Sequence, residues 1–385
     1  MNISNMLFGK EWKELKSFEN LSEPQRSIVF YAENKASINH FNSLIHELTE
    51  NMNLDICYVT SVKDDPIHEN INPKIRSFYI GDGTVRTKFF LGLKAKILIM
   101  DMPDLETYHI KRSKIYPVHY IYIFHSIFSV HSYLRKGAVD NYDTIFCVGP
   151  HHKNEIQETE KIYNLKPKNL ISFGFPRLDT LLNEKQNYSK NFDTNNNNLI
   201  LLTPSYGKNN LLEICGFELI KILLESNFKV LLRPHFKILK DSKKLISKIL
   251  DEFGNNPNFS LENGVIPSKL FHSSICMISD WSGISFEYAF TFERPVIFID
   301  VPKKILNPNF HDISLEPIEI SYRDKIGFVV SPHELKTIPD LIYKSKNNNL
   351  SIIESIKKIR SRTIYNLGES AIIGAKYIQK LTKEL

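Results

Sequence analysis

Short apolar runs of four to six residues recur along the chain and alternate with longer segments of helical periodicity. The runs lack strict alternation of apolar and polar residues, which predicts strands buried on both faces, as in a parallel sheet covered by helices. Segments such as Ile38–Thr49 and Lys153–Tyr163 fit the helical crossovers of a doubly wound α/β domain. The strands predicted in the first half are Ser27–Tyr31, Asp55–Thr60, Ser77–Ile80, Ala95–Met100, Tyr120–Phe124, Thr144–Val148 and Leu170–Phe173.

An Asn-rich segment, Asn183–Asn198, separates this series from a second one and is the best linker candidate in the chain. The later strands are predicted at Leu199–Thr203, Lys229–Leu232, Phe259–Glu262, Cys276–Ser279, Val296–Asp300 and Phe328–Val330. The later helices are predicted at Leu211–Ser226, Ser242–Phe253, Ser268–His272, Gly283–Phe292, Glu334–Lys344 and Ile352–Leu381.

The pattern therefore predicts an α/β protein with two Rossmann-like doubly wound domains that face a central cleft, followed by C-terminal helices. A length of 385 residues agrees with two domains. Ligands are expected at the carboxyl ends of the strands that face the cleft. The predicted boundaries are 1–185 for the first domain, 186–198 for the linker, 199–335 for the second domain and 336–385 for the helical segment.

Composition narrows the class of protein. The net charge of +6 is a mild excess, and residues 336–385 carry all of it, with ten basic and four acidic residues. This predicts no nucleic acid partner. Four distant cysteines without C-x-x-C spacing predict neither disulfides nor a zinc site. No apolar run approaches 18 residues, so the sequence predicts a cytoplasmic protein and leaves contact with a membrane surface open.

Polar residues follow the strands of the second domain. The strand Lys229–Leu232 leads into Arg233-Pro234-His235, which places a permanent cation and an imidazole at a strand end. A guanidinium matches phosphate oxygens, and a histidine can donate a proton or a hydrogen bond to a leaving group. The alternative is an arginine paired with a carboxylate beside a surface histidine.

The strand Cys276–Ser279 leads through Asp280 to Ser282 and Gly283, where a helix containing Glu287 is predicted to begin. A Ser282 N-cap, the free amides of the first turn and the helix dipole together form an anion site. If a phosphate lies at the cap, the Glu287 carboxylate is placed to reach ribose hydroxyls. In the alternative, Ser282 only caps its helix and Glu287 is solvated.

Two further turns after strands offer backbone groups to a ligand, although neither has the spacing of a P-loop. The first turn contains Pro204, Ser205, Tyr206 and Gly207. The second contains Asn263, Val265 and Ile266.

In the first domain a predicted strand delivers His125 to its carboxyl end. A histidine there is a candidate general base, because its ordinary pKa lies near neutrality; the alternative is a core histidine. His151 and His152 lack a carboxylate at a diagnostic spacing, so no metal is assigned, and no cofactor is predicted. The sequence also contains no D-x-D triplet, which weakens a mechanism with Mg²⁺ held by paired carboxylates.

Taken together, these motifs resemble the CDP-glycerol glycerophosphotransferase family of teichoic acid primases, polymerases and capsule-assembly relatives. The resemblance covers about residues 115–385, and it implies the GT-B fold without a dedicated metal site. The residues that carry it are Pro204-Ser205-Tyr206-Gly207, Arg233-Pro234-His235, Ser279-Asp280-Trp281-Ser282, Phe286-Glu287-Tyr288-Ala289, Pro295-Val296-Ile297-Phe298, His125-Ser126 and Gly149-Pro150-His151.

The resemblance also implies roles for single residues. His125 falls on the histidine expected to activate the acceptor hydroxyl, and His235 on the one expected to bind the diphosphate and help CMP leave. Ser279 and Ser282 fall on phosphate-contacting positions.

Two positions depart from the family pattern. Ser126 replaces the usual Gly after the first histidine, and Gly283 stands where many members have a second Ser. The first departure affects the geometry of the acceptor site, and the second removes one hydrogen-bond donor to phosphate.

The implied function is transfer of glycerol phosphate, or a similar polyol phosphate, from CDP-glycerol to a hydroxyl of a glycan or lipid-linked acceptor, with release of CMP. Two alternatives remain open: a GT-B glycosyltransferase that uses a CMP- or NDP-activated sugar, and a non-catalytic nucleotide-binding assembly protein. The basic residues Lys357, Lys358, Arg360 and Arg362 are expected to lean on the anionic inner face of the cell membrane.

Overall fold

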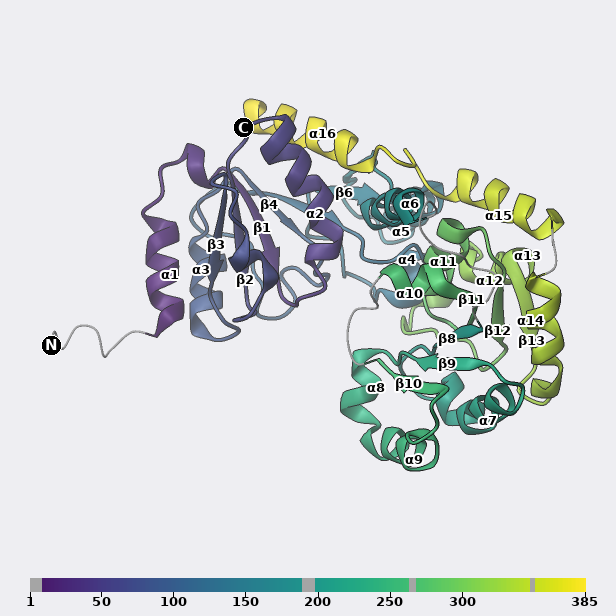
Figure 1. Ribbon diagram of the computed structural model, residues 1–385. Helices are drawn as coiled ribbons and strands as arrows, with labels where there is room; N and C mark the ends of the chain where they lie inside the picture. The colour runs from purple at the N-terminus through teal and green to yellow at the C-terminus, as the bar shows by residue number, and fades with distance from the viewer. Residues whose placement is uncertain (1–8, 189–197, 263–267, 347–349) are drawn as a thin grey trace, which may run out of the picture.

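The computed structural model describes residues 9–188, 198–262, 268–346 and 350–385, and it shows two α/β lobes, each built around one parallel sheet (Figure 1). The predicted linker at 186–198 lies mostly outside the described residues, and residues 186–188 end helix α6. All thirteen predicted strands are present, with boundaries that differ by no more than two residues. The fold is therefore GT-B, with two Rossmann-like units.

The first sheet has the strand order β3-β2-β1-β4-β5-β6-β7. Successive residues of β1 are buried in two different clusters: Val29 and Tyr31 on one face, Phe30 on the other. Both faces are therefore covered, which explains why its strands lack apolar and polar alternation. The strands are β1 Ile28–Ala32, β2 Ile56–Thr60, β3 Ile75–Tyr79, β4 Ile97–Met100, β5 His119–Ile123, β6 Thr144–Cys147 and β7 Asn169–Ser172.

Helices connect these strands and cover the sheet. The α-helices are α1 Lys10–Glu19, α2 Ile38–His46, α3 Thr84–Gly92, α4 Val130–Tyr133, α5 Pro150–Ile162 and α6 Pro176–Tyr188. The shorter turns are η2 Pro24–Arg26, η3 Glu47–Asn51 and η4 Pro66–Glu69.

The second sheet has the order β10-β9-β8-β11-β12-β13, which repeats the first six positions of the first sheet. In both sheets the strand order reverses next to the first strand of the unit, where such folds bind ligands. The strands are β8 Leu199–Thr203, β9 Lys229–Leu232, β10 Phe259–Leu261, β11 Ser274–Ser279, β12 Val296–Ile299 and β13 Gly327–Val330.

The helices of the second lobe match the predicted segments, with short turns added. They are η5 Leu212–Gly216, α7 Phe217–Glu225, α8 Phe236–Asp241, α9 Lys243–Phe253, α10 Ser268–Ser273, α11 Ile284–Phe292, η6 Phe310–Asp312, α12 Ile318–Ser321, α13 Arg323–Ile326, η7 Leu335–Thr337 and α14 Ile338–Lys346.

The single helix predicted over Ile352–Leu381 is wrong, because the segment forms α15, Leu350–Thr363, and α16, Ser370–Glu384. Between them Asn366 and Gly368 adopt positive φ angles of 44° and 85°, which end a helix. Helix α15 packs against α13 and α11 of the second lobe, whereas α16 packs against α2 and α6 of the first (Figure 1). The C-terminal helices thus join both lobes.

The joint between α15 and α16 is held by the first lobe. The Asn366 amide donates to the carbonyl of Ser172 at 2.6 Å, and the Asp179 carboxylate accepts from the backbone of Gly368 at 2.7 Å and of Ser370 at 3.0 Å. Among the helices in the described ranges, none combines the length and the apolar character needed to cross a membrane.

Candidate active site

The turn after β8 is organised by a buried carboxylate. Asp280, at the end of β11, is 1% exposed and accepts hydrogen bonds from the backbone N–H of Ser205 at 2.7 Å and of Leu211 at 3.0 Å. Burial raises the pKa of Asp280, and these hydrogen bonds oppose that shift. Gly207 has a φ of +106°, which favours glycine. Asp280 therefore shapes the turn and lies beneath its surface.

Ser279 and Ser282 occupy different environments. The Ser279 hydroxyl is fully buried and donates to the Thr203 carbonyl at 2.7 Å, so it links β11 to β8. The predicted side-chain cap by Ser282 is wrong. Helix α11 begins at Ile284 with Gly283 as its N-cap and without a side-chain cap hydrogen bond. Of the two serines, Ser282 is the one whose hydroxyl makes no hydrogen bond with the described residues.

His235 begins α8 and lies among cations. Its Nδ1 accepts a hydrogen bond from the Lys237 backbone N–H at 3.2 Å, so the neutral ring carries its proton on Nε2. Burial, followed by the charges of Lys304, Lys237, Arg233 and His125, lowers the pKa of His235 to about 3. The ring is neutral near pH 7 and offers one N–H donor.

Glu287 is buried, which excludes the alternative in which its side chain is solvated. Its carboxylate pairs with Nε of Arg177, on α6 of the first lobe, at 2.7 Å. Burial lowers the pKa of Arg233, while Glu287 favours its charged form and Arg177 disfavours it. The Glu287 carboxylate thus interacts electrostatically with two arginines, Arg177 of the first lobe and Arg233 of the second.

His125 follows β5 and is exposed to solvent, although aromatic rings surround it. The ring centroids of His40 and Tyr133 lie 6.2 and 6.1 Å from its own. Partial loss of hydration lowers the pKa of His125, and a hydrogen bond to the Asp101 backbone opposes this shift. The donated proton fixes the tautomer and leaves the other ring nitrogen as a proton acceptor.

The two lobes meet beside His125. A Cβ atom placed on Gly283 would lie 2.8 Å from Oγ of Ser126, so the absence of a side chain at Gly283 lets Ser126 approach α11. His125 also disfavours protonation of His235. The structure therefore brings both predicted histidines and both departures from the family pattern to the same junction.

His151 and His152 are structural. Their Nε2 atoms lie 2.7 and 2.9 Å from the carbonyls of Ile127 and Phe128, and these contacts support the segment that follows His125. Within the described residues no group of three or more histidines, cysteines and carboxylates is arranged to hold a metal ion.

Several residues of the site were missed by sequence reasoning: Lys304, Lys237, Arg177, Tyr133 and His40. Each lies in an ordinary loop or helix without a motif, so only the fold brings it to the site. The predicted donor-binding residues Asn263, Val265 and Ile266 lie outside the described residues.

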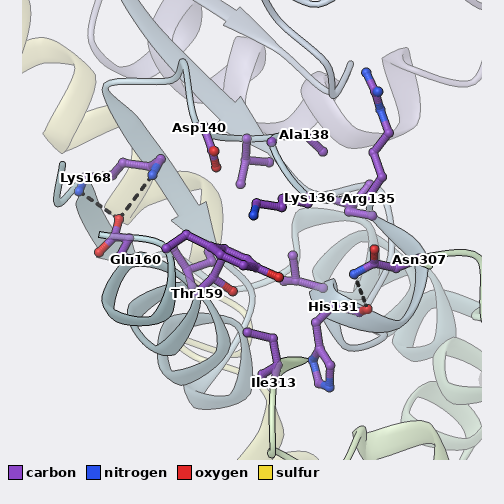
Figure 2. Close-up of a pocket in the computed structure, with 16 residues that line it drawn as sticks. His131, Arg135, Lys136, Ala138, Asp140, Thr159, Glu160, Lys168, Asn307 and Ile313 are labelled. Atoms are coloured by element: carbon purple, nitrogen blue, oxygen red, sulfur yellow. Dashed lines mark hydrogen bonds and ion pairs between the residues drawn. The ribbon is translucent and has the colours of Figure 1, made fainter. Parts of the chain in front are cut away.

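A small cavity of about 30 Å³ lies at the junction away from these residues (Figure 2). It is lined by the first lobe together with Ile313 and Asn307 of the second, and the Asn307 amide donates to the His131 carbonyl at 2.9 Å. The cavity is far smaller than a nucleotide site, and no predicted site residue lines it.

Two Rossmann units with polar strand ends at their junction define a GT-B protein, the architecture of many nucleotide-dependent transferases. The model of the family CDP-Glycerol:Poly(glycerophosphate) glycerophosphotransferase matches residues 17–304. The chain belongs to this family, and it is a glycerophosphotransferase enzyme. A search of curated proteins finds no match.

Solved structures share the fold. The wall teichoic acid polymerase TagF superposes with a TM-score of 0.65 at 15% identity, over 99% of this chain and 96% of that chain. A putative UDP-N-acetylglucosamine 2-epimerase from Listeria monocytogenes gives 0.58 at 13% identity, over 94% and 98%. The UDP-GlcNAc 2-epimerase of Methanocaldococcus jannaschii gives 0.55 at 14% identity, over 92% and 99%.

Proposed function

We propose that the enzyme transfers glycerol phosphate from CDP-glycerol to a hydroxyl of a glycan or lipid-linked acceptor in the synthesis of a surface polymer. The observation that carries the proposal is the placement of His125 and His235, from different lobes, within electrostatic reach of each other beside three cations of the second lobe. Among the TagF structures, some carry a histidine replaced by Asn together with CDPG. That combination agrees with CDP-glycerol as the donor in this family.

The geometry supports a direct displacement. The acceptor oxygen attacks the distal phosphorus while its proton passes to the neutral ring of His125. The bond between that phosphorus and the bridging oxygen breaks, and CMP leaves with the electron pair. His235 donates its Nε2–H to the diphosphate, and Arg233 and its neighbouring cations stabilise the developing charge.

The test is release of CMP from CDP-glycerol by the purified chain with a lipid-linked glycan acceptor. We expect His125→Ala to reduce kcat about 10²- to 10⁴-fold, because a positioned base contributes that much. His235→Ala should reduce kcat and raise KM, because it contacts the donor. The control is His333→Ala, a change at an exposed surface position. Full turnover by His125→Ala would contradict the assignment.

If the acceptor is lipid-linked, the enzyme must reach a membrane surface, and the basic face of α15 supports such a contact. Of the four basic residues predicted to contact the membrane, two form ion pairs within the protein. Arg360 pairs with Glu293 at 2.9 Å and Lys357 with the same carboxylate at 3.4 Å, whereas Lys358 and Arg362 are exposed and form no ion pair with the described residues.

Co-sedimentation with phosphatidylglycerol vesicles tests this contact. The double change Lys358→Gln and Arg362→Gln should weaken binding about thirtyfold, since each basic residue contributes on the order of 1 kcal/mol. Phosphatidylcholine vesicles and the Lys221→Gln variant, at an exposed position of helix α7, serve as controls. Binding that is insensitive to the double change and to salt would contradict the contact.

A further inference from the structure

Lys304 forms the centre of an aromatic and cationic cluster in the second lobe. It follows β12, and its Nζ lies 3.3 Å from the centroid of the Tyr206 ring. Nζ of Lys237 lies 4.4 Å from the same ring, and the Tyr206 and His235 ring centroids are 4.4 Å apart. Two ammonium groups and the proposed donor-binding histidine therefore surround one aromatic side chain.

Among the described residues, the cluster has no carboxylate in ion-pair contact. Within the described ranges, no Asp or Glu oxygen comes within 4.0 Å of Nζ of Lys304 or Lys237. Asp280 is the carboxylate that acts on Lys304, and its two oxygens already accept backbone hydrogen bonds from Ser205 and Leu211. A partly dehydrated ammonium group without a counterion is costly. Such an arrangement favours the arrival of an anion from solution.

We propose that Lys304 binds the diphosphate of the nucleotide donor and holds it against the Nε2–H of His235. The identity of the ligand as CDP-glycerol rests on the proposed function. The diphosphate site itself rests on the cluster of cations around Tyr206. Tyr206 then acts as the surface on which Lys304 is held, through contact between the ammonium group and the ring face. This gives Tyr206 a positioning role.

The charge of this cluster changes with pH through Lys304. Burial lowers the pKa of Lys304 to about 8, with Asp280 opposing the shift and Lys237 adding to it. Of the groups that face it, His235 is neutral throughout this range, because its pKa is lowered to about 3. Burial raises the pKa of Tyr206, which therefore stays protonated, and Arg233 remains charged. Affinity for a diphosphate should be full below about pH 8 and fall above it.

The experiment is calorimetric titration of CDP and CDP-glycerol into the full chain, at about pH 7 and about pH 9.5. The variants are Lys304→Met, Lys304→Arg and the control Lys303→Met, at an exposed neighbouring position. We expect Lys304→Met to weaken both ligands about tenfold at the lower pH, in line with the loss of a charged hydrogen bond. The wild type should weaken towards the value of Lys304→Met at the higher pH. Lys304→Arg should bind equally at both pH values, because arginine stays charged.

The outcomes separate this inference from the proposed reaction. Unchanged affinity in Lys304→Met, wild-type affinity independent of pH, or no binding of CDP by the wild type would each overturn the inference. Binding of CDP that depends on Lys304, without release of CMP from CDP-glycerol, would support the inference and contradict the reaction alone. A purely structural role would lower the melting temperature of Lys304→Met without altering the dependence of affinity on pH.

Discussion

Ser126 and Gly283 lie in close contact across the junction between the two lobes. Ser126 accepts a hydrogen bond from the Phe128 backbone N–H at 3.2 Å, so its own proton remains available for donation. Because Gly283 lacks a side chain, this hydroxyl lies against the N-terminus of α11. We expect this hydroxyl to compensate for the one that is absent from position 283.

A double-mutant cycle tests this compensation. Gly283→Ser should displace Ser126 from Phe128, which costs about 1 kcal/mol of stability and lowers kcat/KM. Adding Ser126→Gly should remove the collision and restore part of the activity. We therefore expect a coupling free energy of about 1 kcal/mol between the two sites, measured from kcat/KM and from denaturant unfolding. Additive effects would contradict the pairing.

Tyr133 offers a second test at the scale of one residue. Its hydroxyl is buried and makes no hydrogen bond with the described residues, while its ring lies 6.1 Å from that of His125. An unpaired buried hydroxyl lowers stability, and one beside a catalytic group can bind substrate. Tyr133→Phe should raise the free energy of unfolding by about 1 kcal/mol and reduce kcat/KM about tenfold. Unchanged activity in the more stable variant would exclude a role in binding.

At the scale of secondary-structure elements, the turn between β8 and η5 is held by hydrogen bonds to Asp280, at the end of β11. Asp280→Asn retains the size of the side chain but replaces one acceptor oxygen with an NH₂ group that cannot accept from Ser205 or Leu211. The cost of an unpaired buried N–H is about 1–3 kcal/mol. We expect this loss in urea unfolding together with a raised KM for the donor, because the turn carries Tyr206. A KM equal to that of the wild type would separate the turn from donor binding.

The elements also show what sequence can predict. Strands such as β8 and β9 were predicted to the residue, because apolar runs covered by helices on both faces leave a clear signal. The break between α15 and α16 was missed, since its cause lies in Ser172 and Asp179 of the other lobe. Local motifs predicted His125 and His235 as site residues. Lys304 and Arg177 lie outside any motif, and only the tertiary structure brings them to the site.

At the scale of the whole molecule, the lobes are held together by a buried polar cluster around α4. Glu319 of the second lobe accepts from the Ser129 backbone N–H at 3.0 Å, and the Ser129 hydroxyl accepts from Ile318 N–H at 3.0 Å. His131 lies between Glu155 of its own lobe, at 3.1 Å, and the Leu315 carbonyl of the other, at 2.9 Å. Nδ1 makes no hydrogen bond with the described residues, but the adjacent Glu155 carboxylate favours a protonated ring.

The stability of this junction should depend on pH. Although burial opposes it, Glu155 raises the pKa of His131, and burial raises the pKa of Glu319 to about 7. Both pKa values exceed those of the unfolded chain, so both contributions are complete below the unfolded pKa and are lost as pH rises through the folded one. In urea unfolding, His131→Gln should be about 1 kcal/mol or more less stable than the wild type near pH 6, with a smaller difference near pH 8. His333→Gln, at an exposed position, should match the wild type at both pH values. A difference that grows with pH would mean that His131 is neutral in the folded protein, and that the lobes are joined by packing and uncharged hydrogen bonds.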